Sequence, residues 1–79
     1  MYYIVGSQKC PWCDKAQALL TEKGLEYTYV DISKNQMILN LFNSTSFKTI
    51  PQIWNDSMYI GGYDDLKLIH TSLERNNDA

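Results

Sequence analysis

Cys10-Pro11-Trp12-Cys13 contains the only two cysteines in this chain of 79 residues. The stretch follows a short aromatic and β-branched segment at residues 2–5, and it starts a run whose apolar residues recur at helical spacing. A Cys-x-x-Cys pair between a predicted strand and a predicted helix is typical of a thiol redox site. These four residues are therefore the starting point for predicting both the fold and the chemistry.

The motif favours a reactive Cys10 if a helix begins there. Pro11 then occupies the first helical position, where a proline is well tolerated. The Cys10 sulfur faces unpaired N–H groups and the positive end of the helix dipole, and Lys9 adds positive charge. Such surroundings lower a cysteine pKa from about 8.5 to roughly 3.5–7.5, although Asp14 in the first turn moderates the effect. We therefore predict that Cys10 attacks a disulfide and that the less exposed Cys13 resolves the mixed disulfide.

Other interpretations of the cysteine pair are weaker. A structural zinc site takes four Cys or His ligands, whereas the chain has two cysteines and one histidine, His70. A structural disulfide at this short separation closes too small a loop to constrain the unfolded chain much. A chance pair within a helix remains open, although Pro11 and the strand-to-helix position disfavour it. We therefore predict no metal site.

Length and composition indicate a single globular domain over residues 1–79. Hydrophobic residues make up 44% of the chain and charged residues 20%, which is ordinary for a globular protein. A total of 7 Lys and Arg against 9 Asp and Glu gives a net charge of −2, so nothing favours a nucleic-acid partner. No signal peptide and no membrane span are expected. A cysteine pair without export signals predicts a reducing, cytoplasmic location in which the pair cycles between dithiol and disulfide.

The first half of the chain predicts a β-α-β unit. Residues 2–5 form a buried strand, residues 11–23 a helix and residues 26–32 a second strand. Gly24 suits the left-handed position that ends a helix. The inward face of the helix comprises Cys13, Ala16, Leu19 and Leu20. The second strand places Thr28, Val30 and Ile32 on one face and Tyr27 and Tyr29 on the other. The two strands should be parallel, because a helical crossover connects them.

The second half predicts a helix, a hairpin and a last helix. The helix covers residues 35–43, and its apolar side chains are assigned to the core: Met37, Ile38, Leu41 and Phe42. Residues 52–54 and 58–60 form a hairpin around a turn at residues 55–57, and Gly61 and Gly62 end it. The last helix covers residues 63–74, with an inward face of Leu66, Ile69 and Leu73. The order β-α-β-α-β-β-α fits a four-stranded mixed sheet flanked by three helices on both faces.

Three stretches together resemble the glutaredoxin family, whose fold is the thioredoxin-like α/β fold. They are Cys10-Pro11-Trp12-Cys13, Thr49-Ile50-Pro51 and Gly61-Gly62-Tyr63-Asp64-Asp65, in this order and at these spacings. The resemblance covers essentially the whole chain. The short length and a lysine directly before the first cysteine are similar to small bacteriophage glutaredoxins.

The resemblance implies a glutathione site beside the cysteines. It implies a cis bond before Pro51, where the residues alone allow a cis bond and a trans proline starting an edge strand about equally. The Ile50 backbone would then pair with the extended tripeptide, and the glycines and helix start after the hairpin would take its γ-glutamyl end. The residues implied are Lys9, Trp12, Thr49, Ile50, Pro51, Gly62, Tyr63, Asp64 and Asp65, with Gln36 and Lys48 as further candidates.

Two positions depart from the family pattern. Many members carry a lysine three residues before the first cysteine, where this chain has Ser7. The partner of the glycine carboxylate of glutathione is therefore left open among Lys9, Gln36 and Lys48. Trp12 replaces the more usual tyrosine, so it keeps an aromatic face but lacks the phenol hydroxyl.

The resemblance implies a glutathione-dependent thiol–disulfide oxidoreductase of the electron-transport and cell redox homeostasis type. Glutathione would be a co-substrate, no cofactor would be bound permanently, and a monomer would act in the cytoplasm, or in the host cytoplasm if phage-encoded. Disulfide-containing or glutathionylated proteins would be substrates, with ribonucleotide reductase as a candidate by family analogy. The alternatives are a redoxin reduced by thioredoxin reductase, an iron–sulfur cluster module, which Pro11 disfavours, and a catalytically silent interaction domain.

Overall fold

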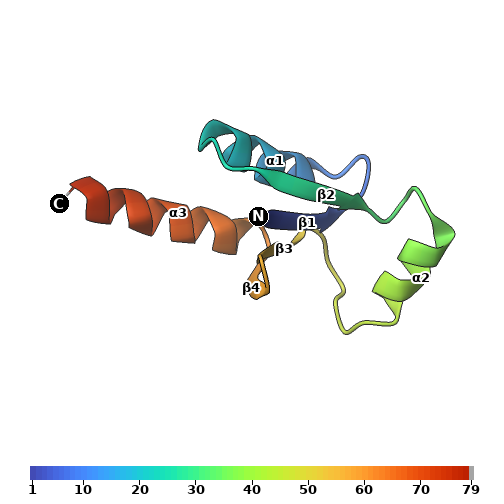
Figure 1. The fold of residues 1–79 in the computed structure, drawn as a ribbon. Helices are drawn as coiled ribbons and strands as arrows, with labels where there is room; N and C mark the ends of the chain where they lie inside the picture. The colour runs from blue at the N-terminus through green and yellow to red at the C-terminus, as the bar shows by residue number, and fades with distance from the viewer. Residues whose placement is uncertain (79) are drawn as a thin grey trace.

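The computed structural model describes the backbone of residues 1–78 and the side chains of residues 1–70. The elements follow the order β1 (Tyr2–Gly6), α1 (Pro11–Glu22), β2 (Tyr27–Asp31), α2 (Gln36–Asn43), β3 (Gln52–Asn55), β4 (Met58–Gly61) and α3 (Tyr63–Asp78) (Figure 1). This order confirms the predicted arrangement of helices and strands. Most ends agree within one or two residues, but α3 continues four residues beyond its predicted end at residue 74.

The four strands form one mixed sheet in the order β2-β1-β3-β4. β1 is parallel to β2, with Ile4 opposite Tyr29, and this confirms the predicted β-α-β unit. β1 is antiparallel to β3, with Ile4 opposite Ile53, and β3 is antiparallel to β4. The carboxyl end of β1, which leads to the cysteine motif, therefore lies in the middle of the sheet rather than at an edge.

The core fills the space between one face of the sheet and the helices α1 and α3. Its buried side chains are Ile4, Ala16, Leu20, Ile53 and Leu66. Side chains alternate between the faces of a strand, so Ile4 and Ile53 point into this core while their neighbours point the other way. Burying such aliphatic side chains contributes about 1.5–3 kcal/mol each. The core holds α1 against the sheet through Ala16 and Leu20.

The helix α1 ends close to the predicted position. Lys23 is the C-cap, and Gly24 adopts a left-handed conformation with φ +70°. A left-handed residue after a helix is usually glycine, because a Cβ is disfavoured there. The Leu25 N–H then donates to the Leu20 carbonyl oxygen at 2.9 Å, which turns the chain back toward β2.

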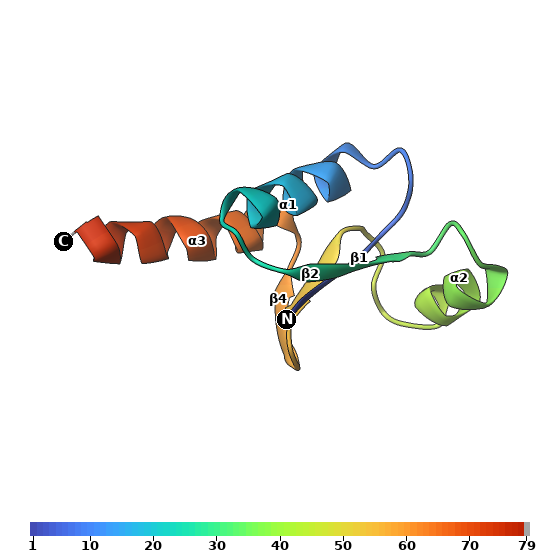
Figure 2. The ribbon, with the colours of Figure 1, turned by 45° about the horizontal axis from the view of Figure 1, so that its top comes forward.

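The helix α2 corrects the prediction that its four apolar side chains join the core. Met37 and Leu41 are 70% and 63% exposed, whereas Ile38 and Phe42 are half-buried. Figures 1 and 2 show α2 at the end of the sheet away from α3. An apolar groove of about 300 Å³ separates α2 from the sheet and is lined by Val5, Val30, Ile32, Ile38, Leu41, Phe42, Thr45, Phe47 and Trp54. A helix of two turns that a groove separates from the sheet buries only part of its apolar surface.

The remaining burial predictions hold in part. Tyr3 is exposed, although the strand at residues 2–5 was predicted to be buried, because it points away from α1 and α3. Ile69 is 40% exposed, so its predicted inward position is wrong, and His70 takes that position with 7% exposed. The residues three and four positions after Leu66 both lie near one helix face, and packing selected the second. Leu73 lies outside the described side chains.

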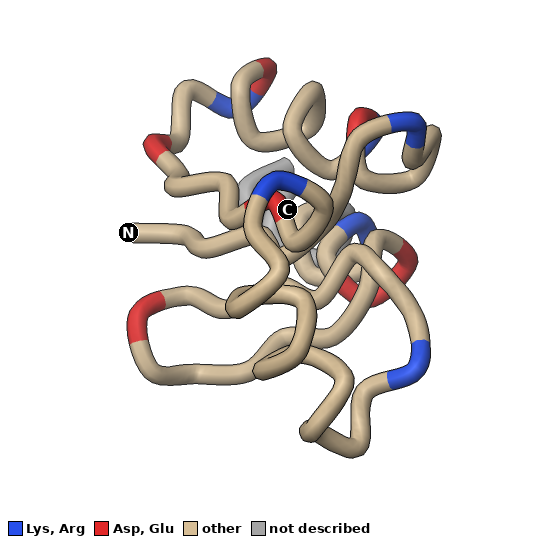
Figure 3. The backbone as a smooth tube through the Cα atoms, turned by 90° about the vertical axis from the view of Figure 1, so that its right-hand side faces the viewer, with Lys and Arg blue, Asp and Glu red and all other residues tan. Residues whose placement is uncertain are grey.

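Charged positions are interspersed around the fold. Figure 3 shows Lys and Arg positions and Asp and Glu positions on several sides of the fold, with neither kind gathered on one side. This distribution agrees with the small net charge of −2. Among the described residues, no helix is both long and apolar enough to cross a bilayer.

Candidate active site

The cysteine pair lies at the start of α1, as its sequence predicts. Cys10 is the N-cap, with an extended backbone, and Pro11 is the first helical residue. Cys13 lies one turn further on, and its Cα is 5.2 Å from the Cα of Cys10, to which it is joined by a disulfide. The helix start thus holds both sulfur atoms at the carboxyl end of β1.

The two cysteines differ in accessibility and in hydrogen bonding. Cys10 is 8% exposed and Cys13 is completely buried. The backbone N–H of Cys13 donates to the Cys10 sulfur at 3.2 Å. A hydrogen bond from the helix start favours negative charge on that sulfur once the disulfide is reduced. The geometry therefore gives Cys10 the features of an attacking thiolate and Cys13 those of a resolving thiol.

A hollow of about 180 Å³ adjoins the cysteine motif, and we call it the active-site hollow. Its lining residues come from three separate segments and are Trp12, Ile50, Pro51, Tyr63 and Asp64. The rings of Trp12 and Tyr63 form one wall, with centroids 5.6 Å apart. The Ile50–Pro51 peptide bond is cis, as the resemblance implied. The three stretches that are distant in sequence thus meet in one place.

The other six predicted ligand-binding residues do not line the hollow formed by the described residues. Gly62 lies beside the Pro51 backbone, and its N–H donates to the Asp65 carboxylate at 3.1 Å, so Asp65 caps the start of α3. Lys9 and Lys48 are exposed. The Gln36 side-chain amide donates to Asn40 within α2. The sixth, Thr49, accepts hydrogen bonds from the Gln52 amide.

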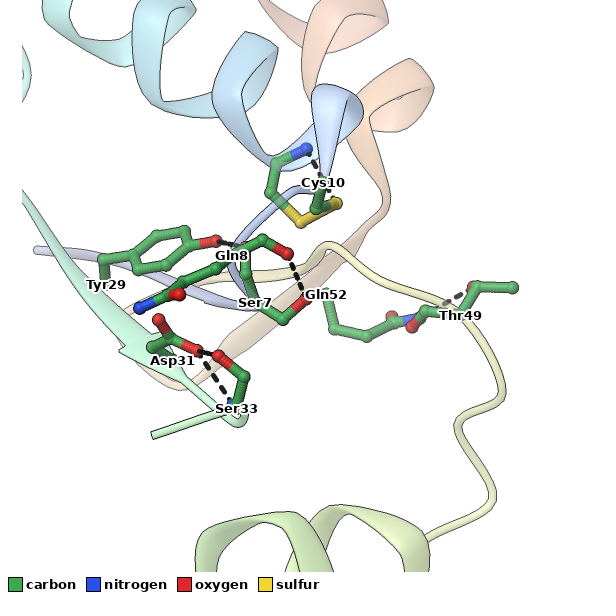
Figure 4. The surroundings of a disulfide bond; sticks show 9 residues. Ser7, Gln8, Cys10, Tyr29, Asp31, Ser33, Thr49 and Gln52 are labelled. Atoms are coloured by element: carbon green, nitrogen blue, oxygen red, sulfur yellow. Dashed lines mark hydrogen bonds between the residues drawn. A yellow bond between two sulfur atoms is a disulfide. The ribbon is translucent and has the colours of Figure 1, made fainter. Parts of the chain in front are cut away.

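Gln52 is a supporting residue that the sequence analysis missed. It is buried, and its amide nitrogen donates to the Thr49 carbonyl oxygen at 2.8 Å and to the Thr49 hydroxyl at 3.2 Å. Its amide oxygen accepts a hydrogen bond from the Tyr59 hydroxyl. Figure 4 shows the Gln52 side chain extended toward Thr49. These bonds hold the segment that leads to Pro51, and a lone glutamine in a short strand carries no signal of this role.

Lys15 is a second residue that the sequence analysis did not identify. Its Nζ lies 4.3 Å from the centroid of the Trp12 ring. A cation over an indole face contributes about 0.5–1 kcal/mol at an exposed site. Lys15 and Tyr63 together hold the ring of Trp12, which is 51% exposed, at the mouth of the active-site hollow. The spacing of three residues along α1 could have suggested the Lys15 contact.

The loop between β1 and Cys10 is tied to β2 by Tyr29. The Tyr29 hydroxyl donates to the Ser7 carbonyl oxygen at 2.8 Å (Figure 4). Burial is the main cause that raises the pKa of Tyr29 above its ordinary value, and the charge of Asp31 adds to it. The pKa of Asp31 is itself lowered, chiefly because the Ser33 hydroxyl donates to its carboxylate. Tyr29 therefore remains a neutral hydroxyl behind the cysteines.

No group of three or more His, Cys, Asp or Glu residues within the described part of the chain is arranged to hold a metal ion. The cysteine pair itself offers thiol chemistry, because its two sulfur atoms can exchange with a disulfide. The neighbouring hollow adds aromatic, backbone and carboxylate groups.

Comparisons with known proteins agree with this geometry. The glutaredoxin family model matches residues 1–60. Glutaredoxin 1 of Rickettsia bellii is 39% identical over 71 residues, which cover 84% of this chain and 69% of that protein. The solution structure of glutaredoxin from Brucella melitensis has a TM-score of 0.74 and 30% identity, covering 96% of this chain and 84% of that one.

A more distant solved structure shares the fold. The buckwheat glutaredoxin–glutathione complex has a TM-score of 0.78 and 19% identity, and the match covers 90% of this chain and 68% of that one. The family model, the Rickettsia relative and the cysteine geometry point to the same chemistry. The chain therefore belongs to the glutaredoxin family of thiol–disulfide oxidoreductases.

Proposed function

We propose that this protein is a glutathione-dependent oxidoreductase that reduces protein disulfides and glutathione mixed disulfides through Cys10 and Cys13. One observation carries the proposal. Trp12, which lies between the two cysteines in sequence, also lines a hollow with Pro51 and Tyr63, so a bound tripeptide there would lie next to the reacting sulfur. The known complex of the buckwheat neighbour with glutathione supports this choice of co-substrate.

The groups around the active-site hollow suit the parts of glutathione. The backbone N–H and C=O of Ile50 suit the extended peptide, with Thr49 beside it and Pro51 beneath. Backbone N–H groups of the first turn of α3, which follow Gly62, suit the γ-glutamyl carboxylate, while the Gly62 N–H itself donates to Asp65. An Asp64 carboxylate suits the α-ammonium group. Asp65 supports that site by capping the helix, and Trp12 and Tyr63 supply an aromatic wall. For the glycine carboxylate we propose Lys9, with Gln36 and Lys48 as the other candidates.

The proposed reaction is a series of thiol–disulfide exchanges. The Cys10 thiolate attacks one sulfur of a substrate disulfide, and the other sulfur leaves as a thiolate. The Cys13 thiol loses its proton, attacks Cys10 and releases the reduced substrate, which leaves the Cys10–Cys13 disulfide. A glutathione thiolate then attacks Cys10, and Cys13 leaves as a thiolate that takes up a proton. A second glutathione thiolate attacks the glutathione sulfur of this mixed disulfide, so that oxidised glutathione forms and the Cys10 thiolate is released. For a glutathionylated substrate, Cys10 alone completes the exchange.

We propose that one copy of the chain is the active unit, because Cys10 and Cys13 are three residues apart and Trp12 between them adjoins the hollow. We also propose that it works in a reducing cytoplasm, on disulfide-containing or glutathionylated proteins. Ribonucleotide reductase is a candidate substrate by family analogy. Thioredoxin reductase remains the alternative source of electrons, and it would reduce the same Cys10–Cys13 disulfide.

The test is reduction of a small glutathionylated disulfide, coupled to glutathione and glutathione reductase, with the wild type and two single variants. We expect an active wild type, loss of activity in Cys10→Ser and retained activity in Cys13→Ser. Only the wild type should reduce a protein disulfide efficiently, because that substrate requires the resolving thiol. An inactive wild type with glutathione, together with activity when thioredoxin reductase supplies the electrons, would reject glutathione dependence.

A further inference from the structure

Tyr29 lies directly behind the cysteine motif, although it is not part of any motif identified in the sequence. It belongs to β2 and is half-buried on the face that packs against the core. Its hydroxyl donates to the Ser7 carbonyl oxygen at 2.8 Å, in the loop that leads to Cys10. Figure 4 shows its ring extending from β2 toward that loop, on the same side as the disulfide.

Gly6 shows how near Tyr29 comes to Cys13. A Cβ at Gly6 would lie 2.5 Å from the Tyr29 hydroxyl oxygen and 2.8 Å from the Cys13 sulfur. Both distances are far shorter than a normal carbon contact of about 3.5–4.0 Å. The hydroxyl and the sulfur therefore face the same small space above a buried glycine, and a side chain at Gly6 would push them apart.

Reduction of the disulfide gives Cys13 a new need for a hydrogen-bond acceptor. In the disulfide, the Cys13 sulfur carries no hydrogen. After reduction its thiol has one S–H donor, and a completely buried donor needs an acceptor. A tyrosine hydroxyl has one hydrogen and two lone pairs. Because Tyr29 uses its hydrogen on Ser7, its lone pairs remain to accept the hydrogen bond from Cys13.

Burial, and after it the groups around Tyr29, favour the protonated hydroxyl. Burial, Asp31 on its own strand, Asp14 on α1 and the neighbouring Tyr27 all raise the pKa of Tyr29. Only the neutral hydroxyl can donate a hydrogen bond to the Ser7 carbonyl oxygen and at the same time accept one from a thiol.

We propose that the Tyr29 hydroxyl accepts a hydrogen bond from the thiol of reduced Cys13 and thereby shifts the disulfide–dithiol equilibrium toward the dithiol. The couple involves two electrons and two protons: the Cys10–Cys13 disulfide is reduced while a dithiol reagent is oxidised. The bond from Tyr29 to Ser7 can form in both redox states and cancels from this equilibrium. A hydrogen bond changes this equilibrium only if it forms in one redox state and not in the other. The inference requires the thiol–disulfide activity but not glutathione dependence.

The test equilibrates the protein in mixtures of reduced and oxidised dithiothreitol at pH 7 and measures the fraction of disulfide after acid quenching and alkylation. Tyr29→Phe should lower the equilibrium constant for reduction by about two- to tenfold, the effect of one net hydrogen bond. Tyr27→Phe is the matched control, because it lies on the same strand and face and loses a hydroxyl bonded to Gln17 at 3.1 Å. Its equilibrium constant should equal that of the wild type.

Two further measurements separate this role from a structural one. Gly6→Ala, which places a methyl group between hydroxyl and sulfur, should lower the same equilibrium constant even if Tyr29→Phe does not fold. In a Cys10→Ser background, the pH profile of Cys13 alkylation should shift to lower pH when Tyr29 becomes Phe, since the acceptor serves only the protonated thiol. An unchanged or increased constant in Tyr29→Phe, or an equal change in Tyr27→Phe, overturns the proposal.

Discussion

Replacement of Trp12 by alanine is the most direct test of the active-site hollow. A fully enclosed tryptophan buries about 150–250 Å², and Trp12 is 51% exposed, so on the order of 100 Å² of its surface is open to a ligand. If glutathione covers half of that area, at about 25 cal/mol per Å², Trp12→Ala costs about 1.2 kcal/mol. This corresponds to about an eightfold weaker affinity.

Steady-state kinetics with varied glutathione measure this effect. Trp12→Ala should raise KM for glutathione by about eightfold and leave kcat within a factor of about two, because the wall binds ligand but transfers no proton. Trp12→Phe should recover part of the loss. Leu68→Ala serves as the control, since Leu68 is also an exposed apolar side chain but does not line the hollow. A KM in Trp12→Ala that equals that of the control would refute the placement of glutathione in this hollow.

Three further predictions concern stability and support of the site. Leu20→Ala should lower the free energy of unfolding by about 2–5 kcal/mol, since Leu20 is completely buried. Leu41→Ala on α2 should change that free energy by less than about 0.5 kcal/mol, and urea titration measures both variants. Burial lowers the pKa of His70, so the unfolded chain binds a proton there more readily, and stability should fall as pH drops below about 6.5. Stability that does not change with pH in this range would contradict this, and His70→Phe should reduce the slope of stability against pH. Gln52→Leu should destabilise the oxidised protein by about 1–3 kcal/mol and raise KM for glutathione, because Thr49 loses both bonds; calorimetry and kinetics test each part.

The most reliable sequence predictions depended on neighbouring residues alone. Pro11 after Cys10 indicates a helix start, because proline suits the first helical position, and the structure has α1 beginning there. Gly24 indicates the end of the same helix through its left-handed conformation. The alternation of Tyr29 and Val30 indicates a strand with two different faces, and these residues do lie on opposite faces of β2.

The errors arose where packing chooses between positions that look alike in sequence. Ile69 and His70 both lie near the Leu66 face of α3, and the less apolar residue is the one that is buried. Met37 and Leu41 follow the helical period of a core element, yet a groove separates α2 from the sheet and both side chains are exposed. Periodicity shows which side chains share a face, but it does not show how far a neighbouring element covers that face.

The sequence by itself determined the order of elements, the start of α1 at the cysteines and their unequal accessibility, because caps, turns and side-chain periods act over a few residues. Trp12, Pro51 and Tyr63 were grouped beforehand only by the family resemblance, and the tertiary structure places them around one hollow. Only the tertiary structure decided that Gln52 supports the segment before Pro51. It also decided that Tyr29 faces Cys13 across Gly6. These contacts join residues that are far apart in the chain, and they depend on the pairing of strands and the packing of helices rather than on any local preference.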